Sequence, residues 1–177
     1  MTIPQSNHSG ISYAFACVLA SCLCAPACSS QSSSARPNML LVKLDSSTDP
    51  GAEIARRAMT LTGVRYKYGG TSPESGMDCS GLVRYVFQKT WEMDLPRTSD
   101  EISRVGRHIE MHDLQPGDLV FYNTLRRKFS HVGIYVGDNK FVHAPTAGGK
   151  VRVESMELSY WKKRFDGARR ISHPKRR

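Results

Sequence analysis

The chain contains the stretch Gly76-Met77-Asp78-Cys79-Ser80-Gly81-Leu82, which separates a glycine-rich turn from a segment with helical periodicity. Apolar residues follow at positions 82, 83, 86 and 87, the spacing that places side chains on one face of a helix. Asp78 stands at the N-cap position, where its carboxylate accepts hydrogen bonds from the first free backbone N–H groups. Cys79 then falls in the first helical turn, where the helix dipole favours an anion. We therefore predict that Cys79 is a nucleophile with a depressed pKa, partly thiolate near neutral pH.

Two histidines downstream are candidates for the base that a cysteine nucleophile needs. A cysteine on its own is more often a small buried apolar residue, so the functional interpretation depends on them. His131 begins the run His131-Val132-Gly133-Ile134-Tyr135-Val136, and His143 lies in Lys140-Phe141-Val142-His143-Ala144. Both runs are rich in β-branched and aromatic residues, and Gly137-Asp138-Asn139 between them is a hairpin turn signal. We expect two antiparallel strands that bring the histidines together on one face, in the residue order of papain-like peptidases.

Three blocks of the sequence resemble the signature blocks of the NlpC-type cell-wall peptidases: Asp78-Cys79-Ser80-Gly81, His131-Val132-Gly133-Ile134-Tyr135 and Phe141-Val142-His143-Ala144. Two further stretches agree with the family: Tyr66-Lys67-Tyr68-Gly69-Gly70 ahead of the cysteine, and Leu114-Gln115-Pro116-Gly117-Asp118-Leu119-Val120-Phe121 ahead of His131. The resemblance extends over residues 52–171 and implies a papain-like fold. It also implies a cysteine peptidase in which Cys79 attacks an amide, His131 transfers protons and His143 orients His131. Tyr66 would then lie beside the nucleophile and stabilise the oxyanion.

The end of the chain narrows this resemblance. Tyr160-Trp161-Lys162-Lys163-Arg164-Phe165 and Ala168-Arg169-Arg170 look like the murein endopeptidase lipoproteins of Gram-negative bacteria. The resemblance therefore implies hydrolysis of peptidoglycan stem peptides, and the D-alanyl–diaminopimelate cross-link is the expected bond. The alternatives are a γ-D-glutamyl–diaminopimelate endopeptidase of the same family and a non-catalytic wall-binding lipoprotein.

Substrate-binding residues are expected next to the nucleophile and shortly before His131. Asp78 and Ser80 flank Cys79, and we predict that both contact the substrate. Arg126, Arg127 and Lys128 lie in the segment that leads to His131, where they could pair with carboxylates of the substrate. Exposed pairs of this kind contribute less than about 1 kcal/mol each. This segment is more basic than the family pattern, which leaves the substrate preference open.

The N-terminal part of the sequence has the pattern of a targeting segment. Residues 11–20 form a short apolar run, and Leu19-Ala20-Ser21-Cys22 resembles a bacterial lipobox. We predict a signal peptide over residues 1–21, lipidation of Cys22, a flexible tether over residues 22–50, and a peptidase domain with a basic tail over residues 51–177. The resemblance implies an envelope protein anchored to the outer membrane by its lipid and facing the periplasm. A soluble secreted protein and an uncleaved cytoplasmic protein are the alternatives.

Composition bounds the other possibilities. The chain has 177 residues, 40% of them hydrophobic, which is enough to form the core of a single domain. Its formal net charge is +9. This charge suggests an anionic wall or membrane as partner, because no zinc-finger or RNA-binding motif accompanies it to indicate nucleic acid. A zinc site formed by Cys79, His131 and His143 is the rival chemistry, but the closely spaced Cys or His pairs common in zinc sites are missing. We expect no metal, no cofactor and a monomer.

The order of predicted elements indicates an α+β fold. Helices are expected over residues 52–59, after Cys79, and at Thr98, where Glu101 completes the spacing of a capping box. Strands are expected later, near residues 119–122, 131–136, 140–144, 151–153 and 168–171. Because the helices precede the strands and do not alternate with them, we predict N-terminal helices packed on an antiparallel sheet of five or six strands. Tyr68 is interpreted as an aromatic residue that covers a core edge.

Overall fold

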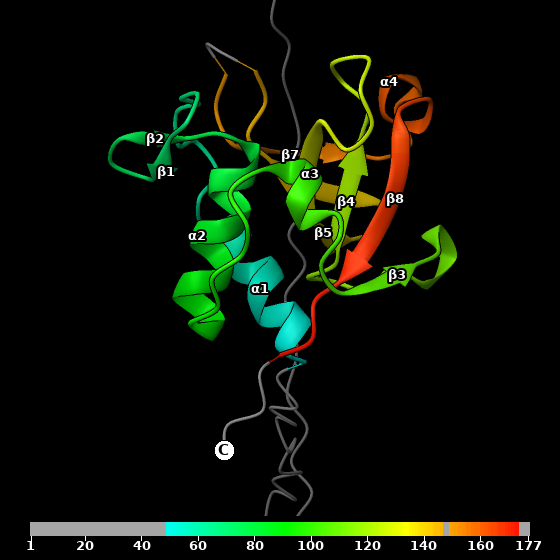
Figure 1. Cartoon of the computed structure of the whole chain (residues 1–177), viewed down its shortest axis with the longest axis horizontal. Coiled ribbons are helices and arrows are strands. Elements are labelled where there is room, and N and C mark those ends of the chain that lie inside the picture. The colour runs from blue at the N-terminus through cyan, green and yellow to red at the C-terminus, as the bar shows by residue number, and fades with distance from the viewer. Residues whose placement is uncertain (1–48, 147–148, 174–177) are drawn as a thin grey trace, which may run out of the picture. The chain divides into compact units, whose positions relative to one another are not determined.

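The computed structural model describes residues 49–146 and 149–173 (Figure 1). The predicted signal peptide, the lipidation site Cys22 and nearly all of the tether therefore lie outside the described residues, as does the end of the basic tail. The first helix begins at Pro50, one residue before the predicted start of the domain. Among the described residues, no helix has both the length and the apolar character needed to span a bilayer.

Two helices carry the N-terminal half of the core. Helix α1, Pro50–Met59, begins with a proline in its first turn and an Asp49 side chain that accepts from the Gly51 N–H. Helix α2, Cys79–Trp91, has Asp78 as its N-cap, as predicted, and ends at Glu92 in the left-handed conformation (φ 53°). The predicted apolar stripe of α2 is buried, and so are Ile54, Ala55 and Ala58 of the stripe predicted for α1, whereas its fourth member, Met59, is 42% exposed.

The strands form a six-stranded antiparallel sheet in the order β3-β8-β4-β5-β6-β7, so the α+β prediction is confirmed. Its strands are β3 Arg107–Ile109, β4 Leu119–Tyr122, β5 His131–Gly137, β6 Lys140–His143, β7 Arg152–Ser155 and β8 Phe165–Arg170. The smaller elements are β1 Thr71–Ser72, β2 Gly76–Met77, α3 Ser99–Ile102, the 3₁₀ turn η1 Met111–Asp113, and α4 Ser159–Lys162. The sequence does not predict β3, because two of its three side chains are exposed and polar and leave no apolar pattern.

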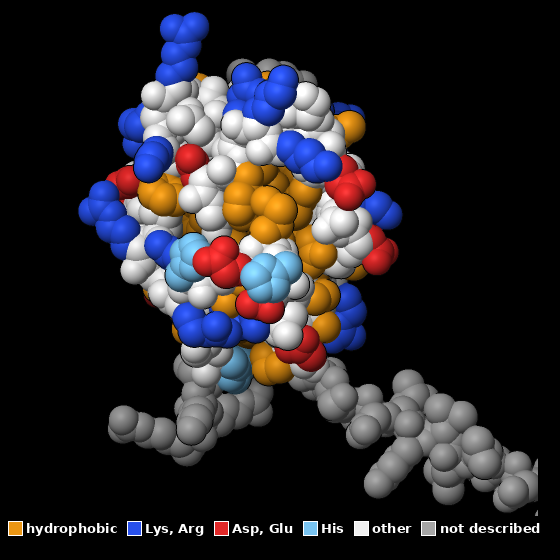
Figure 2. All heavy atoms as spheres, turned by 90° about the vertical axis from the view of Figure 1, so that its right-hand side faces the viewer, with side chains coloured by type: hydrophobic (Ala, Val, Ile, Leu, Met, Phe, Trp, Pro, Cys, Tyr) orange, Lys and Arg blue, Asp and Glu red, His pale blue; other side chains and the backbone are white. Residues whose placement is uncertain are grey.

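The sheet has two apolar faces with different coverings. On the face we call the helical face, Phe121, Val132 and Ile134 join the core cluster that includes the buried residues of α1 and α2. Figure 1 shows both helices on this side of the sheet. On the opposite face, which we call the outer face, Tyr122 and Phe141 form a second cluster with Trp161 of α4. Figure 2, viewed from the side of β8, shows hydrophobic side chains gathered at the centre of that side, with Lys and Arg around them.

The β5–β6 hairpin has the predicted turn. Asp138 and Asn139 both have positive φ values, 51° and 54°, which is the conformation of a type I′ turn. The pairing places Tyr135 opposite Phe141 and Ile134 opposite Val142. Because side chains alternate along a strand, His131 and His143 both point to the side of the sheet that carries Tyr135 and Phe141. The expectation that the hairpin brings the two histidines to one face is therefore confirmed.

Candidate active site

Asp78 holds the start of α2 through a network of hydrogen bonds. Its Oδ1 accepts from the Gly81 N–H at 2.7 Å and from Ser80 Oγ at 3.1 Å, and its Oδ2 accepts from the Gly69 N–H at 2.9 Å. Arg97 donates to both carboxylate oxygens, with 2.6 Å between Nη2 and Oδ2, and its Nη1 lies 2.7 Å from Ser80 Oγ. The acceptors of Asp78 are thus used to fix the turn that presents Cys79.

Sequence reasoning missed Arg97. The residue lies in a loop, 19 positions after Asp78, and carries no motif signal of its own. The pairing follows from the fold, since the segment before α3 returns to the N-terminus of α2. Burial raises the pKa of the Asp78 carboxyl, but the hydrogen bonds from Arg97 and the Gly81 N–H together outweigh burial, so the net pKa is lowered and Asp78 is ionised. Asp78 and Ser80 are therefore joined in an internal scaffold at the edge of the site.

The two histidines form a buried pair. His131 Nε2 and His143 Nδ1 lie 2.9 Å apart, and the ring planes are nearly perpendicular at 87°. The indole of Trp161 stacks on His131, with 5.7 Å between ring centroids and an angle of 25°, and meets His143 edge-on. Because Nε2 of His131 is engaged with His143, Nδ1 is the ring nitrogen left to exchange a proton with a nucleophile.

Cys79 and His131 line one cleft of about 640 Å³, which we call the Cys79 cleft. Its walls come from the turn before α2, the segment before α3, the loop that leads to β5, and the residues after β6. They include Tyr66, Asp78, Cys79, Ser80, Arg97, Thr124, Arg127, His131 and Pro145. Cys79 is the one free cysteine among the described residues.

The structure separates the three basic residues expected to bind substrate. Arg127 lines the Cys79 cleft, whereas Arg126 lines a neighbouring hollow together with Lys163 and Arg164. Lys128 lines neither of these two hollows. Of the three cations, Arg127 is therefore the one that shares a cleft with Cys79.

The two tyrosines before α2 differ in environment. Tyr66 is half-buried, lines the Cys79 cleft and packs against the core cluster of the helical face. Burial and the nearby Cys79 and Asp78 charges raise the pKa of Tyr66, so its hydroxyl stays protonated and able to donate. Tyr68 is 88% exposed, so the interpretation that it covers a core edge is wrong. Tyr68 instead lines the Cys79 cleft together with Tyr66.

The expectation of a depressed cysteine pKa is also wrong. Burial raises the pKa of the Cys79 thiol to about 11, and the Asp78 carboxylate adds to the increase. The backbone hydrogen bonds from Val132, Ser80 and Cys79 itself lower the pKa but do not compensate. The helix dipole was the basis of the prediction, and desolvation of the sulfur outweighs it. At neutral pH the Cys79 side chain is therefore the neutral thiol.

The histidines are neutral for the same reason. Burial lowers the pKa of His131 to about 3, with a further decrease from His143 and an opposing increase from Glu154. Burial also lowers the pKa of His143 to about 3, and Arg152 adds to that decrease. A neutral imidazole beside a neutral thiol can accept the thiol proton while the sulfur attacks a carbonyl carbon. The arrangement is suited to acyl transfer through a cysteine.

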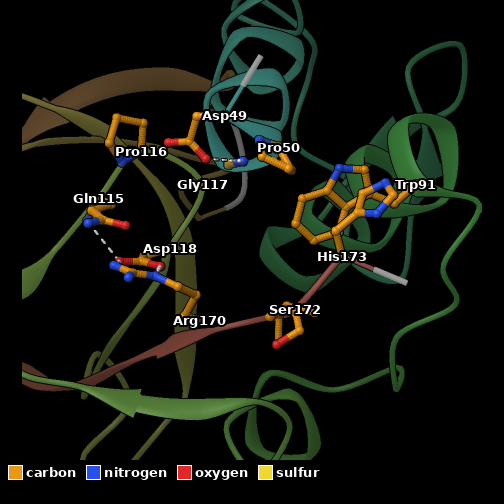
Figure 3. A pocket seen from close by; sticks show the side chains of 12 residues that line it. Asp49, Pro50, Trp91, Gln115, Pro116, Gly117, Asp118, Arg170, Ser172 and His173 are labelled. Carbon is orange, nitrogen blue, oxygen red and sulfur yellow. Dashed lines mark hydrogen bonds and ion pairs between the residues drawn. The ribbon is translucent and has the colours of Figure 1, made fainter. Parts of the chain in front are cut away.

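A separate hollow of about 190 Å³ lies where the two ends of the described chain meet (Figure 3). Arg170 of β8 pairs with the buried Asp118 there, with 2.7 Å between Nη2 and Oδ2, and the Gln115 N–H donates to the same carboxylate. These contacts join the ends of β4 and β8. The hollow shares no residue with the Cys79 cleft. Within residues 49–146 and 149–173, no group of three His, Cys, Asp or Glu side chains is arranged to hold a metal ion.

Comparison with known proteins finds relatives that share part of this sequence. The murein DD-endopeptidase MepH of Escherichia coli K12 is 40% identical over 122 residues, which cover 67% of this chain and 45% of that protein. The gamma-DL-glutamyl hydrolase of Bacillus subtilis is 37% identical over 121 residues, which cover 68% of this chain and 29% of that protein. The chain therefore spans less than half the length of these two relatives.

A solved structure shows the same fold. The crystal structure of an NlpC/P60 family protein from Bacillus cereus ATCC 10987 aligns with a TM-score of 0.63 and 30% identity, over 70% of this chain and 40% of that one. The expected papain-like arrangement is thereby confirmed. The NlpC/P60 family pattern matches residues 63–170, the part of the sequence that holds Tyr66, Cys79, His131 and His143. The chain belongs to the NlpC/P60 family.

Proposed function

We propose that the protein is a peptidoglycan endopeptidase that hydrolyses stem-peptide amide bonds by a Cys-His-His mechanism. One observation supports the proposal above all: Cys79, at the start of α2, lines the same cleft as His131. Nε2 of His131 in turn lies 2.9 Å from Nδ1 of His143. Family membership and the endopeptidase relative support the same chemistry. A non-catalytic wall-binding role needs none of these three side chains.

In the proposed reaction, Cys79 Sγ attacks the carbonyl carbon of the substrate while its proton passes to Nδ1 of His131. The oxyanion that forms is stabilised by the backbone N–H of Cys79 and the hydroxyl of Tyr66, and one such donor is worth about 2.7–4 kcal/mol. His131 then protonates the departing amine, which leaves a thioester on Cys79. Water attacks the thioester, gives its proton to His131, and releases the carboxylate product and the thiol.

The bond that we favour is the D-alanyl–diaminopimelate cross-link between neighbouring stems. The name of the MepH relative and the sequence at α4, Trp161-Lys162-Lys163-Arg164, support this choice. The gamma-DL-glutamyl hydrolase relative supports the alternative, cleavage of the γ-D-glutamyl–diaminopimelate bond within one stem. Both substrates bring carboxylates to the cleft, where Arg127 lies.

Digestion of purified cross-linked muropeptides by the full chain tests the proposal, with products separated and weighed. Conversion of dimers to intact monomers would establish the cross-link as the bond. Release of a dipeptide from uncross-linked stems would show that the bond cut is instead the γ-D-glutamyl–diaminopimelate bond within one stem. The Cys79→Ala variant is the control, and it should lose activity by about 10⁴-fold or more. Binding to wall without cleavage by either protein would leave only the wall-binding role.

We also propose an envelope location, with the mature chain starting at a lipidated Cys22 after removal of residues 1–21. The lipobox-like sequence before Cys22 supports the anchor, and Leu23 after it is typical of lipoproteins sent to the outer membrane. A tether over residues 22–50 would let a monomeric peptidase domain reach stem peptides, and the basic tail would hold it to anionic wall or membrane. Mass spectrometry of the mature N-terminus tests this proposal. An intact Met1 or cleavage at another residue would refute it.

A further inference from the structure

The outward ring nitrogen of His143 has an unusual environment. His143 is completely buried, and its Nε2 makes no hydrogen bond to another described residue. The carboxylate of Glu154 is its ion-pair neighbour, with 3.5 Å between Nε2 and Oε2. Leaving a buried polar group without a hydrogen bond costs free energy. The placement of His143 Nε2 opposite a carboxylate therefore needs a physical explanation.

The tautomers of the two histidines supply that reason. If Nδ1 of His131 is to accept the thiol proton, then Nε2 of His131 carries hydrogen and donates to Nδ1 of His143 across the 2.9 Å contact. His143 must in turn carry its own hydrogen on Nε2, because a neutral imidazole has one protonated nitrogen. That N–H points towards the side where Glu154 lies, so a carboxylate there stabilises the one tautomer that the reaction needs.

The strand register places Glu154 on the correct side of the sheet. In the β6–β7 pair, His143 is opposite Arg152 and Phe141 is opposite Glu154. Residues two apart on a strand share a face, so Glu154 stands diagonally across from His143 on the outer face. A shift of one residue in this register would turn Glu154 to the other face.

Two donors fix the Glu154 carboxylate. The indole Nε1–H of Trp161 donates to Oε2, and the guanidinium of Arg152 holds Oε1, with 2.6 Å from Nε and 2.5 Å from Nη2. The same Trp161 ring stacks on His131. Glu154 therefore interacts with both histidines. It does so electrostatically with His143, and indirectly with His131 through the Trp161 indole.

We propose that Glu154 is a positioning residue, which keeps His143 protonated on Nε2 and offsets the positive charge that His131 gains during attack. This inference rests on the proposed function. Other charged or titratable groups near the pair are Cys79 from α2, Tyr122 from β4 and Arg152 from β7. Glu154 accepts no proton in this scheme. Its carboxylate acts through its charge and through the orientation of its neighbours, as the third residue of a catalytic triad does.

The test compares Glu154→Gln and Glu154→Ala with the control Glu157→Gln, which changes an exposed carboxylate whose Oε1 accepts from Asn139 Nδ2. Muropeptide cleavage gives kcat and KM, and ¹⁵N NMR of the histidine rings gives the tautomer of His143. We expect kcat to fall about 10–100-fold in both Glu154 variants with little change in KM, the range found when the outer partner that orients a metal-binding histidine is removed. His143 should shift towards the Nδ1–H tautomer, and Glu157→Gln should match the wild type.

A charge effect also predicts a direction in pH. Because Glu154 raises the pKa of His131, its removal should move the ring titration of His131 to lower pH, whereas a purely structural defect would not. Glu154→Gln conserves size, so it decides the matter if Glu154→Ala fails to fold. A wild-type tautomer and a wild-type kcat in Glu154→Gln would overturn the inference. The NMR readout needs no substrate, so a wild-type protein that cleaves no muropeptide would refute the proposed function and leave this test intact.

Discussion

Gly133 of β5 lies against His143 of β6, and the absence of a side chain at Gly133 makes room for the histidine pair. A Cβ at this position would stand 3.3 Å from the Cβ of His143 and 2.5 Å from Cδ2 of Phe141. The contact with Phe141 is closer than packed side chains tolerate, and the contact with His143 is tight enough that the histidine would have to shift by a few tenths of an ångström. Gly133 therefore has a steric role in the site, independent of any backbone conformation special to glycine.

Gly133→Ala should displace Phe141 and His143 together. We expect a loss of stability of about 1–3 kcal/mol, the usual cost of overpacking, and at least a tenfold fall in kcat from the misplaced histidine. Urea unfolding and muropeptide cleavage measure the two effects. Val153→Ala on β7, which β6 separates from β5, is the control; its side chain is 40% exposed, so the change should alter stability by less than about 1 kcal/mol. Wild-type behaviour of Gly133→Ala would contradict the steric explanation.

Arg97→Ala should destabilise the N-terminus of α2. The change removes the partner of a mostly buried Asp78 carboxylate, and hydrogen bonds to a charged group are worth about 1.5–3 kcal/mol. The matched control is Arg104→Ala, which breaks an ion pair with Asp100 whose arginine side chain is 73% exposed, and it should cost less than about 1 kcal/mol. Equal midpoints of urea unfolding for the two variants would show that the Arg97 network adds no stability.

The raised pKa of Cys79 predicts how its alkylation depends on pH. A neutral alkylating reagent reacts with the thiolate, whose fraction increases as pH approaches the pKa of about 11. We therefore expect the alkylation rate of the wild type to keep increasing between pH 9 and 11. The Cys79→Ala protein identifies reaction at the other cysteines. A rate that reaches its plateau near pH 7 would mean that the thiolate is stable in the resting enzyme.

The histidine pair predicts a loss of stability in mild acid. The pKa values of His131 and His143 are about 3 in the folded protein and near 6.5 in the unfolded chain, so the unfolded chain binds more protons between these limits. Stability from the neutral pair is complete above pH 6.5 and is lost as pH falls towards 3, by up to about 1.4 kcal/mol per pH unit for each histidine. His143→Gln should show a shallower fall of melting temperature with decreasing pH. An unchanged slope would contradict the assigned direction.

The three basic residues Arg126, Arg127 and Lys128 should differ in their effect on substrate binding. Arg127→Ala should raise KM for muropeptides, by about fivefold at most, because an exposed ion pair is worth up to about 1 kcal/mol. Arg126→Ala and Lys128→Ala serve as controls, because neither residue lines the Cys79 cleft. Steady-state kinetics at two salt concentrations would measure the effect and its screening. Equal increases in KM for all three variants would indicate attraction by the net charge of the loop.

Local signals in the sequence were sufficient to predict the backbone conformation around the site. The N-cap at Asp78, the capping box at Thr98 and Glu101, and the turn before Lys140 are all interactions between residues at most a few positions apart. Such interactions depend on residue type and spacing, so they can be recognised without the fold. Alternating side chains then placed His131 and His143 on one face, and the sequence alone therefore predicted that the two would meet.

Only the tertiary structure decided the partners and the charge state of these residues. Arg97 meets Asp78, and Glu154 meets His143, through chain returns and a strand register that leave no local pattern. The state of Cys79 shows the physical reason most clearly. Its position in the helix predicted a thiolate, because the dipole and the first N–H groups are local, but desolvation depends on everything that packs over the sulfur. Burial outweighs the dipole, and burial is a property of the folded chain.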